Sequence, residues 1–232
     1  IVSILPISKQ MEENAEDYFL FFATRDGKVK KTPLTEFTGR YSINKNGKRA
    51  LILPEGDQLV SVRIGDNDSH VVLISNIGNA CRFKPSTLKE RKNTETGETE
   101  SYPVLRPLGR NTQPNVGMKL HRKNPITKEI ESLGHVVGMI VSGDENTLVL
   151  TITKYGKAKR SKLGDGLMHD VLDGNGNPIF DSKTQKNKTE RDGFGMSANR
   201  GAQGSKAMGL REKGVPTGVN GKTWLNKMTA KE

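Results

Sequence analysis

One motif occurs three times in the sequence, and this repetition constrains the fold more than any other feature. The copies are "FFATRDGKVKK" (21–31), "VLISNIGNACR" (72–82) and "LTITKYGKAKR" (150–160). They align without gaps around the turn glycines Gly27, Gly78 and Gly156, which are separated by 51 and 78 residues. A repeat of about 50 residues is typical of propeller-like arrays.

Two further elements follow the motif. The second element has an Arg beside a Gly, then polar residues, then apolar residues, and it occurs as "TGRYSINKNGKRALIL" (38–53), "LGRNTQPNVGMKL" (108–120) and "SANRGAQGSKAMGL" (197–210). The third element is a turn that leads into an alternating strand, "LPEGDQLVSVRI" (53–64) and "EIESLGHVVGMIVS" (129–142). Short strands with period-2 alternation and Gly-rich turns predict an all-β array of four-stranded antiparallel blades.

The repeats divide the chain into units. We expect residues 11–64, 65–142 and 143–232 to form three blades. Residues 1–10 would be the end of a preceding blade, because "IVSILPI" (1–7) reads as a strand and matches the end of the third element. This match also predicts that the chain is part of a longer polypeptide.

Two polar segments interrupt the array. Residues 89–103 lie inside the second unit and residues 164–196 inside the third. Their low hydrophobicity offers little burial to offset the entropy lost on ordering. They are therefore expected to be hairpin extensions or flexible loops.

The overall charge indicates the class of partner. The chain has 37 Lys and Arg against 26 Asp and Glu, a formal net charge of +11. Such an excess favours association with an anionic polymer or surface. Cys81 is the only cysteine, which excludes an intrachain disulfide and is typical of a reducing compartment. No apolar run approaches the roughly 20 residues of a membrane helix, so we expect a cytoplasmic protein without a membrane partner.

The second strand of each repeated hairpin is unusually basic. Val29, Ala80 and Ala158 occupy one apolar position, and period-2 alternation puts their neighbours on the opposite face. Two residues further on, all three units have a cation: Lys31, Arg82 and Arg160. We expect these cations where the strand reaches the blade edge, as a row that contacts phosphates. The alternative is an edge strand that lysines protect from aggregation.

The arginines of the second element offer a further set of contacts. Arg40, Arg110 and Arg200 could bind phosphates or could cap blade turns by donating to backbone carbonyls. The complete set of candidate phosphate-binding residues is Lys28, Lys30, Lys31, Arg40, Arg82, Lys84, Arg110, Lys157, Lys159, Arg160, Lys162 and Arg200.

Other motifs predict no chemistry. "DGNGNP" (173–178) is similar to the start of a calcium loop but lacks its register, and its Asn and Gly are typical of a turn. The four histidines have no metal-ligand spacing, and no nucleotide-binding fingerprint is present. The tyrosines, Tyr18, Tyr41, Tyr102 and Tyr155, have no adjacent activating base in the sequence. We therefore expect no catalytic residue, no metal and no cofactor.

The motifs together resemble a known family. "YFLFFATRDGKVKKTPLTEF" (18–37), followed by "LPEGDQLVSVRI", "GNACRF", "LGRNTQPNVGMKL" and "GHVVGMIVS", is similar to the C-terminal domain of the DNA gyrase A subunit. The corresponding domain of topoisomerase IV is the second resemblance. The likeness covers nearly all of residues 1–163 and is patchy beyond.

The resemblance implies a β-pinwheel that binds and bends duplex DNA around its basic perimeter with little sequence preference. It implies a non-catalytic part of an ATP-dependent type II topoisomerase, whose catalytic tyrosine lies upstream. The implied partners are duplex DNA, the remainder of the A-type polypeptide and the ATPase (B-type) subunit. The family's gyrase box, Gln-Arg-Arg-Gly-Gly-Lys-Gly, is matched in "ANRGAQG" (198–204) only by Arg200, Gly201 and Gly204. An alternative function is a propeller-like protein-interaction module whose basic edge binds an acidic partner.

Overall fold

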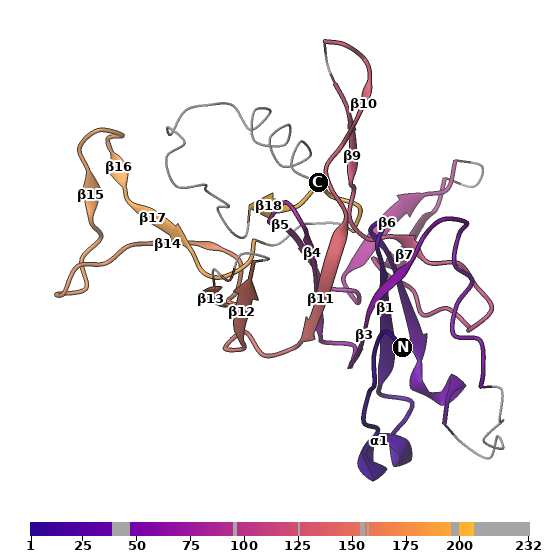
Figure 1. Ribbon diagram of the computed structural model, residues 1–232. Coiled ribbons are helices and arrows are strands. Elements are labelled where there is room, and N and C mark those ends of the chain that lie inside the picture. The colour runs from indigo at the N-terminus through magenta and orange to yellow at the C-terminus, as the bar shows by residue number, and fades with distance from the viewer. Residues whose placement is uncertain are drawn as a thin grey trace.

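The computed structural model describes residues 1–38, 47–94, 97–124, 126–153, 156, 158–195 and 200–206. Within these ranges the fold is all-β, as predicted, with one short α-helix, α1 (Lys9–Glu13), and one 3-10 turn, η1 (Leu34–Glu36) (Figure 1). In the described part of the chain, no helix has the length and apolar character needed to cross a membrane.

The first four-stranded sheet, called blade 1, has the order β3–β1–β2–β8. Its strands are β1 (Phe19–Thr24), β2 (Lys28–Pro33), β3 (Leu59–Gly65) and β8 (Asn115–Val116). The β1–β2 hairpin turns at Gly27, whose φ of 78° is in the left-handed region that glycine adopts without strain. The turn glycine of the repeat is therefore needed for the hairpin.

The second four-stranded sheet, called blade 2, repeats this architecture with the order β11–β4–β5–β18. Its strands are β4 (His70–Ser75), β5 (Asn79–Phe83), β11 (Val136–Ser142) and β18 (Ser205–Lys206). The third copy of the motif forms a two-stranded antiparallel unit, called the third hairpin, from β12 (Leu148–Ile152) and β13 (Ala158–Lys162). All three copies of the repeated motif therefore form antiparallel hairpins, as their common turn glycine predicts.

One edge strand of each blade, β8 in blade 1 and β18 in blade 2, comes from the following unit of the sequence. β8 lies in the second copy of the second element but pairs with β2 of blade 1. β18 lies in the third copy but pairs with β5 of blade 2. Gly27 O also accepts hydrogen bonds from the backbone N–H groups of Gly117 and Met118, both at 2.8 Å. Successive units are thus interlocked by backbone pairing, which gives the second element its structural role.

Two-stranded arms extend from the blades. The first two are β6 (Leu88–Lys92) with β7 (Thr99–Pro103), and β9 (His121–Lys123) with β10 (Ile130–Ser132). A longer arm contains β14 (Met168–Asp170) paired with β17 (Thr189–Arg191), and beyond them β15 (Phe180–Asp181) paired with β16 (Lys186–Asn187). Figure 1 shows the long arm, in orange, projecting away from the two blades. The polar segments 89–103 and 164–196 are therefore hairpin extensions where the structure describes them.

Apolar clusters lie on both sides of the two blades. One cluster joins Phe21 and Val29 of blade 1 to Leu73 and Phe83 of blade 2. Another joins Val72 and Ala80, on the other face of blade 2, to Val149 of the third hairpin. A third covers the remaining face of blade 1 around Leu20 and Phe22. Because blade 1 is covered on both faces, all six residues of β1 are buried.

The N-terminal segment is not a strand, so the strand predicted for residues 1–7 is wrong. Residues 1–8 contain no assigned strand or helix, and α1 begins after Ser8, whose side chain accepts a hydrogen bond from the N–H of Met11. Leu5 and Met11 pack against the cluster on the outer face of blade 1. The apolar residues of this segment therefore cover a sheet face and pair with no strand in the described structure.

Candidate nucleic-acid interface

Lys30 is buried inside blade 1, with no exposed surface. Its Nζ donates hydrogen bonds to the carbonyl oxygens of Ala50 and Arg110, both at 3.0 Å, and is 3.4 Å from that of Thr112. Burial lowers the pKa of Lys30, with Glu36 acting in the opposite direction. This ammonium group holds two loops onto the sheet.

Lys31 is 2% exposed and faces the opposite way. Its Nζ lies 2.6 Å from Oδ1 of Asn67 and 3.8 Å from the centroid of the Phe19 ring, which is cation–π geometry. Burial lowers the pKa of Lys31 to about 8, although Asp66 partly opposes this change. The group is bound within the protein and does not face solvent.

Arg82 has no exposed surface and connects blade 2 to the third hairpin. Its Nη1 donates to the carbonyl oxygens of Leu163, Gly164 and Phe194 at 2.9, 2.8 and 3.2 Å. Burial lowers the pKa of the guanidinium, and the nearby carboxylates oppose this effect. Arg82 therefore stabilises the packing of one unit on the next.

The predicted place of Lys31 and Arg82 at an exposed blade edge is wrong. Lys31 is paired with Phe21 and Arg82 with Val72, so both side chains lie on the sheet face that packs against the next unit. The prediction assumed that only one face of the hairpin is covered. Lys30 is buried for the same reason, because the other face of blade 1 is covered too.

Two of the second-element arginines also bind within the protein. Arg110 Nε lies 3.1 Å from Oε2 of Glu36, and its Nη1 is 3.4 Å from the carbonyl oxygen of Arg49. Arg200 donates from Nε to Val104 O at 2.7 Å and from Nη1 to Val116 O at 2.9 Å. These contacts favour the capping interpretation of this element. Arg40 lies outside the described residues.

The remaining candidates reach solvent. Lys28 is half-buried, and Lys84 forms an ion pair with Asp68 at 2.9 Å. Lys159, Arg160 and Lys162 are all exposed on the five-residue strand β13, and Lys162 lies 3.4 Å from Asp192. Lys157 lies outside the described residues. The exposed part of the predicted set is therefore concentrated on the third hairpin.

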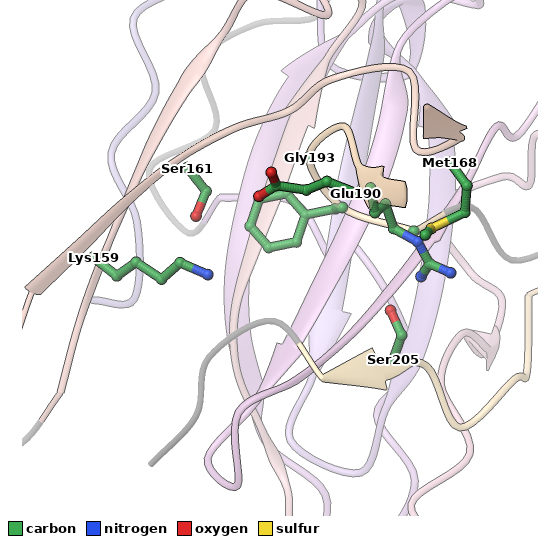
Figure 2. A pocket seen from close by; sticks show the side chains of 9 residues that line it. Lys159, Ser161, Met168, Glu190, Gly193 and Ser205 are labelled. Atoms are coloured by element: carbon green, nitrogen blue, oxygen red, sulfur yellow. The ribbon is translucent and has the colours of Figure 1, made fainter. Parts of the chain in front are cut away.

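A polar pocket of about 410 Å³ lies beside β13. Figure 2 shows Lys159 and the carboxylate of Glu190 pointing into it, with Ser161 beside them. Arg191 and Ser205 complete its polar lining. Two cations and two hydroxyl groups against one carboxylate form a surface that can accept an anionic group.

Sequence reasoning did not select several other exposed cations, among them Arg25, Arg106 and Lys119. Arg25 lies in the β1–β2 turn, Arg106 precedes β8, and Lys119 follows it. Arg106 is close enough to Arg200 to lower its pKa, after the larger effect of burial. Arg25 could have been found from the repeat, because Lys154 is basic at the same turn position. Arg106 and Lys119 have no such signal.

The described residues include no group of three or more His, Cys, Asp or Glu side chains that could hold a metal ion. Cys81 is buried, and its Sγ lies 3.7 Å from the carbonyl oxygen of Gly117. His70 is half-buried, and burial lowers its pKa to about 4, with further lowering by Arg82 and Lys84. Its Nδ1 has no hydrogen-bond partner within the described structure. These side chains take part in packing.

Comparison with known proteins agrees with the family predicted from the motifs. The family model described as DNA gyrase C-terminal domain, beta-propeller, matches residues 18–66 and 197–215. The DNA gyrase A subunit of Aeromonas salmonicida is 43% identical over 83 residues, which are 36% of this chain and 8% of that protein. The DNA gyrase A subunit of Staphylococcus aureus (strain MRSA252) is 32% identical over 165 residues, which are 71% of this chain and 15% of the relative.

Among solved structures, a DNA gyrase A C-terminal domain aligns with a TM-score of 0.43 and 19% identity, covering 85% of this chain and 63% of that one. The chain spans less than a fifth of the length of the curated relatives it matches. Its resemblance to the C-terminal domain of the DNA gyrase A subunit is thus confirmed by the family model and by sequence relatives.

Proposed function

We propose that this chain, which resembles the C-terminal domain of the DNA gyrase A subunit, is a non-catalytic domain that binds and bends duplex DNA. The observation that carries the proposal is the match of the gyrase family to residues 18–66 and 197–215. The net charge of +11 supports a polyanionic partner independently of the family.

Strand passage and ATP hydrolysis would belong to other parts of the enzyme. We assign the breakage of DNA to the remainder of the A-type polypeptide of a bacterial-type type II topoisomerase, and the ATPase activity to its B-type partner. This domain would act on the path of the DNA in the cytoplasm and would not itself break the DNA.

The contacts are electrostatic in this proposal. Each cation that neutralises a phosphate releases condensed counterions, and this contribution to affinity does not depend on base sequence. Lys159 and Lys162 are the strongest candidates, because both are exposed on the third hairpin. Asp192 lies 3.4 Å from Lys162 and reduces the positive charge at that end of the strand.

A second group of cations lies on blade 1. Lys28 and Lys119 flank the backbone contact in which Gly27 O accepts hydrogen bonds from the residues after β8. Arg25 is exposed in the adjacent turn. A duplex that contacts both this group and the third hairpin would span separate units of the array. Bending a 20–30 bp site by 40–90° costs on the order of 1–6 kcal/mol, which contacts on several units can offset.

Binding of labelled duplexes as a function of salt concentration tests the proposal. With the whole chain, we expect log affinity to fall linearly with log salt concentration for duplexes of unrelated sequence. Lys159→Ala should make this slope shallower by about 0.9 for each phosphate that is no longer neutralised, equally for all sequences. Lys9→Ala is the matched control, because Lys9 is an exposed lysine on α1 that forms an ion pair with Glu13.

The same assay separates DNA binding from the recognition of an acidic protein. Poly-glutamate of matched total charge should displace the duplex poorly if the cations follow a phosphate backbone. Equal displacement by the acidic peptide would favour the protein-interaction function. Affinity that is insensitive to salt would contradict both functions.

A further inference from the structure

The third hairpin exposes an apolar face. Leu148, Leu150 and Ile152 are 62%, 61% and 64% exposed. Their cross-strand partners Lys162, Arg160 and Ala158 lie on the same face and are also exposed. The opposite face carries Val149, which is buried against blade 2. Three large aliphatic side chains side by side in water form an unusual surface for a soluble domain.

The corresponding face is covered in both preceding units. Phe21 and Val72, which align with Leu150, have no exposed surface, and Val29 and Ala80, which align with Ala158, are buried. In each case the covering residues come from a later part of the chain. The exposed face of the third hairpin is therefore built like a packing surface.

The repeated cation on this face is also covered by a later part of the chain in both preceding units. Lys31 and Arg82 align with Arg160, and each binds oxygen atoms of a later segment: Lys31 at Asn67, and Arg82 at the carbonyls of Leu163, Gly164 and Phe194. Arg160 occupies this position on an exposed face. Its equivalents predict that Arg160 contacts oxygen atoms of a later segment, as Lys31 contacts a side-chain oxygen and Arg82 contacts backbone oxygens, in place of a phosphate.

The sequence after β18 contains a candidate for the covering segment. Residues 217–225, "TGVNGKTWL", align Gly221 with Gly27, Gly78 and Gly156, and Lys222 with Lys28. The spacing of 65 residues from Gly156 lies between the earlier spacings of 51 and 78. Asn-Gly is also the dipeptide most typical of a two-residue hairpin turn. Residues 215–225 lie outside the described residues.

A second copy of the same face is disfavoured by charge. The face carries Arg160 and Lys162 and no acidic residue among its six paired positions. Two such faces packed together would bring four cations close to one another at a poorly solvated interface. A segment that offers backbone carbonyl oxygens would bind Arg160 in the way that the carbonyls of Leu163, Gly164 and Phe194 bind Arg82.

We propose that residues 215–225 dock over the face formed by Leu148, Leu150, Ile152, Ala158 and Arg160, with Arg160 donating to backbone carbonyls of that segment. The docked segment covers the third hairpin as β4 and β5 cover blade 1. Arg160 then stabilises the array and does not contact DNA. This conclusion does not depend on DNA binding.

Trp224 provides the test, because it is the only tryptophan in the chain and lies in the proposed segment. In the whole chain, we expect Trp224 fluorescence to have a blue-shifted maximum and slow acrylamide quenching. Leu150→Lys should shift the maximum to that of exposed tryptophan and raise quenching several-fold. Ile130→Lys is the control, because Ile130 is 77% exposed on the β9–β10 arm and should leave both readouts unchanged.

A milder variant keeps the test valid if Leu150→Lys prevents the chain from folding. Arg160→Gln keeps the aliphatic face and should give a partial shift in fluorescence. Water-like Trp224 fluorescence in the unmodified chain, or no response to Leu150→Lys, would overturn the proposal. A blue shift that appears only as protein concentration rises would assign the face to a second copy and would also overturn it.

Discussion

Buried cations define the chemistry of this molecule at the scale of the residue. Lys30, Lys31 and Arg82 would each be expensive to bury without partners, since an unpaired buried charge costs several kcal/mol. Each has oxygen partners in the described structure. The repeated cation of the motif thus holds one unit on the next wherever a later unit covers it.

Arg82 offers the most direct test of this role. Arg82→Ala removes the donor of three carbonyl oxygens, so we expect the free energy of unfolding to fall by about 3 kcal/mol. Arg82→Lys should recover part of the loss. Urea unfolding measures the change. A variant of unchanged stability that binds DNA less tightly would instead return Arg82 to the interface.

His70 should make stability depend on pH. Its pKa is about 4 in the folded chain and about 6.5 when unfolded, so the unfolded state binds more protons between these values. Stability should therefore fall as the pH drops from 6.5 to 4, by on the order of 1–3 kcal/mol from this group. His70→Leu, the residue at the equivalent position 148, should flatten this part of the profile. Identical profiles of the two proteins between pH 6.5 and 4 would show that His70 does not contribute.

At the scale of the element, strand exchange between units depends on close backbone approach. A Cβ on Gly27 would lie 2.5 Å from Met118 O and 3.0 Å from Leu120, whereas a Cβ on Gly156 meets nothing within 4 Å. Both glycines have positive φ, at 78° and 76°. Substituting Gly27 and Gly156 in turn therefore separates the cost of backbone strain, which both variants have, from the cost of a clash with the next unit, which only the Gly27 variant has.

We expect Gly156→Ala to cost roughly 1–2 kcal/mol, from the left-handed conformation alone. Gly27→Ala should cost clearly more, because it also displaces the segment after β8. Thermal unfolding of the two variants makes the comparison. Equal losses would indicate that the contact between Gly27 and Met118 does not limit stability.

The elements that sequence could predict are those with local signals. The hairpins follow from turn glycines and alternation, and β3 and β11 follow from the same alternation after a turn. β8 and β18 were not predicted as blade strands, because each has two residues and pairs with a strand far away in the sequence. Likewise, period 2 identifies two faces but cannot reveal that both are covered, so the burial of Lys30, Lys31 and Arg82 was missed.

The candidate interface was predictable in part. The basic strand β13 was identified from the repeat, and its cations Lys159 and Lys162 are exposed, whereas we assign Arg160 on the same strand to packing. Arg106 and Lys119 were missed because their exposure depends on how the second element packs, which no local pattern encodes. The contacts of Arg110 and Arg200 depend on carbonyl oxygens of distant residues, so sequence left their role open.

At the scale of the whole molecule, the proposed action on DNA rests on the charge of +11 and on the repeated units. In the proposed function, exposed cations on blade 1 and on the third hairpin would hold a duplex at separate places. A straight duplex that touches only one group would gain only those phosphate contacts. Bending becomes favourable when both groups are engaged, and it should be modest for an array of this size.

The distance between the ends of a doubly labelled duplex, measured by energy transfer while the protein is titrated at low salt, tests the central claim most directly. We predict a shortening that is modest, independent of base sequence and abolished at high salt, and that is reduced when Lys159 and Lys162 are both changed to Ala. Binding that leaves the end-to-end distance unchanged would contradict the account, as would a shortening that this double variant does not alter.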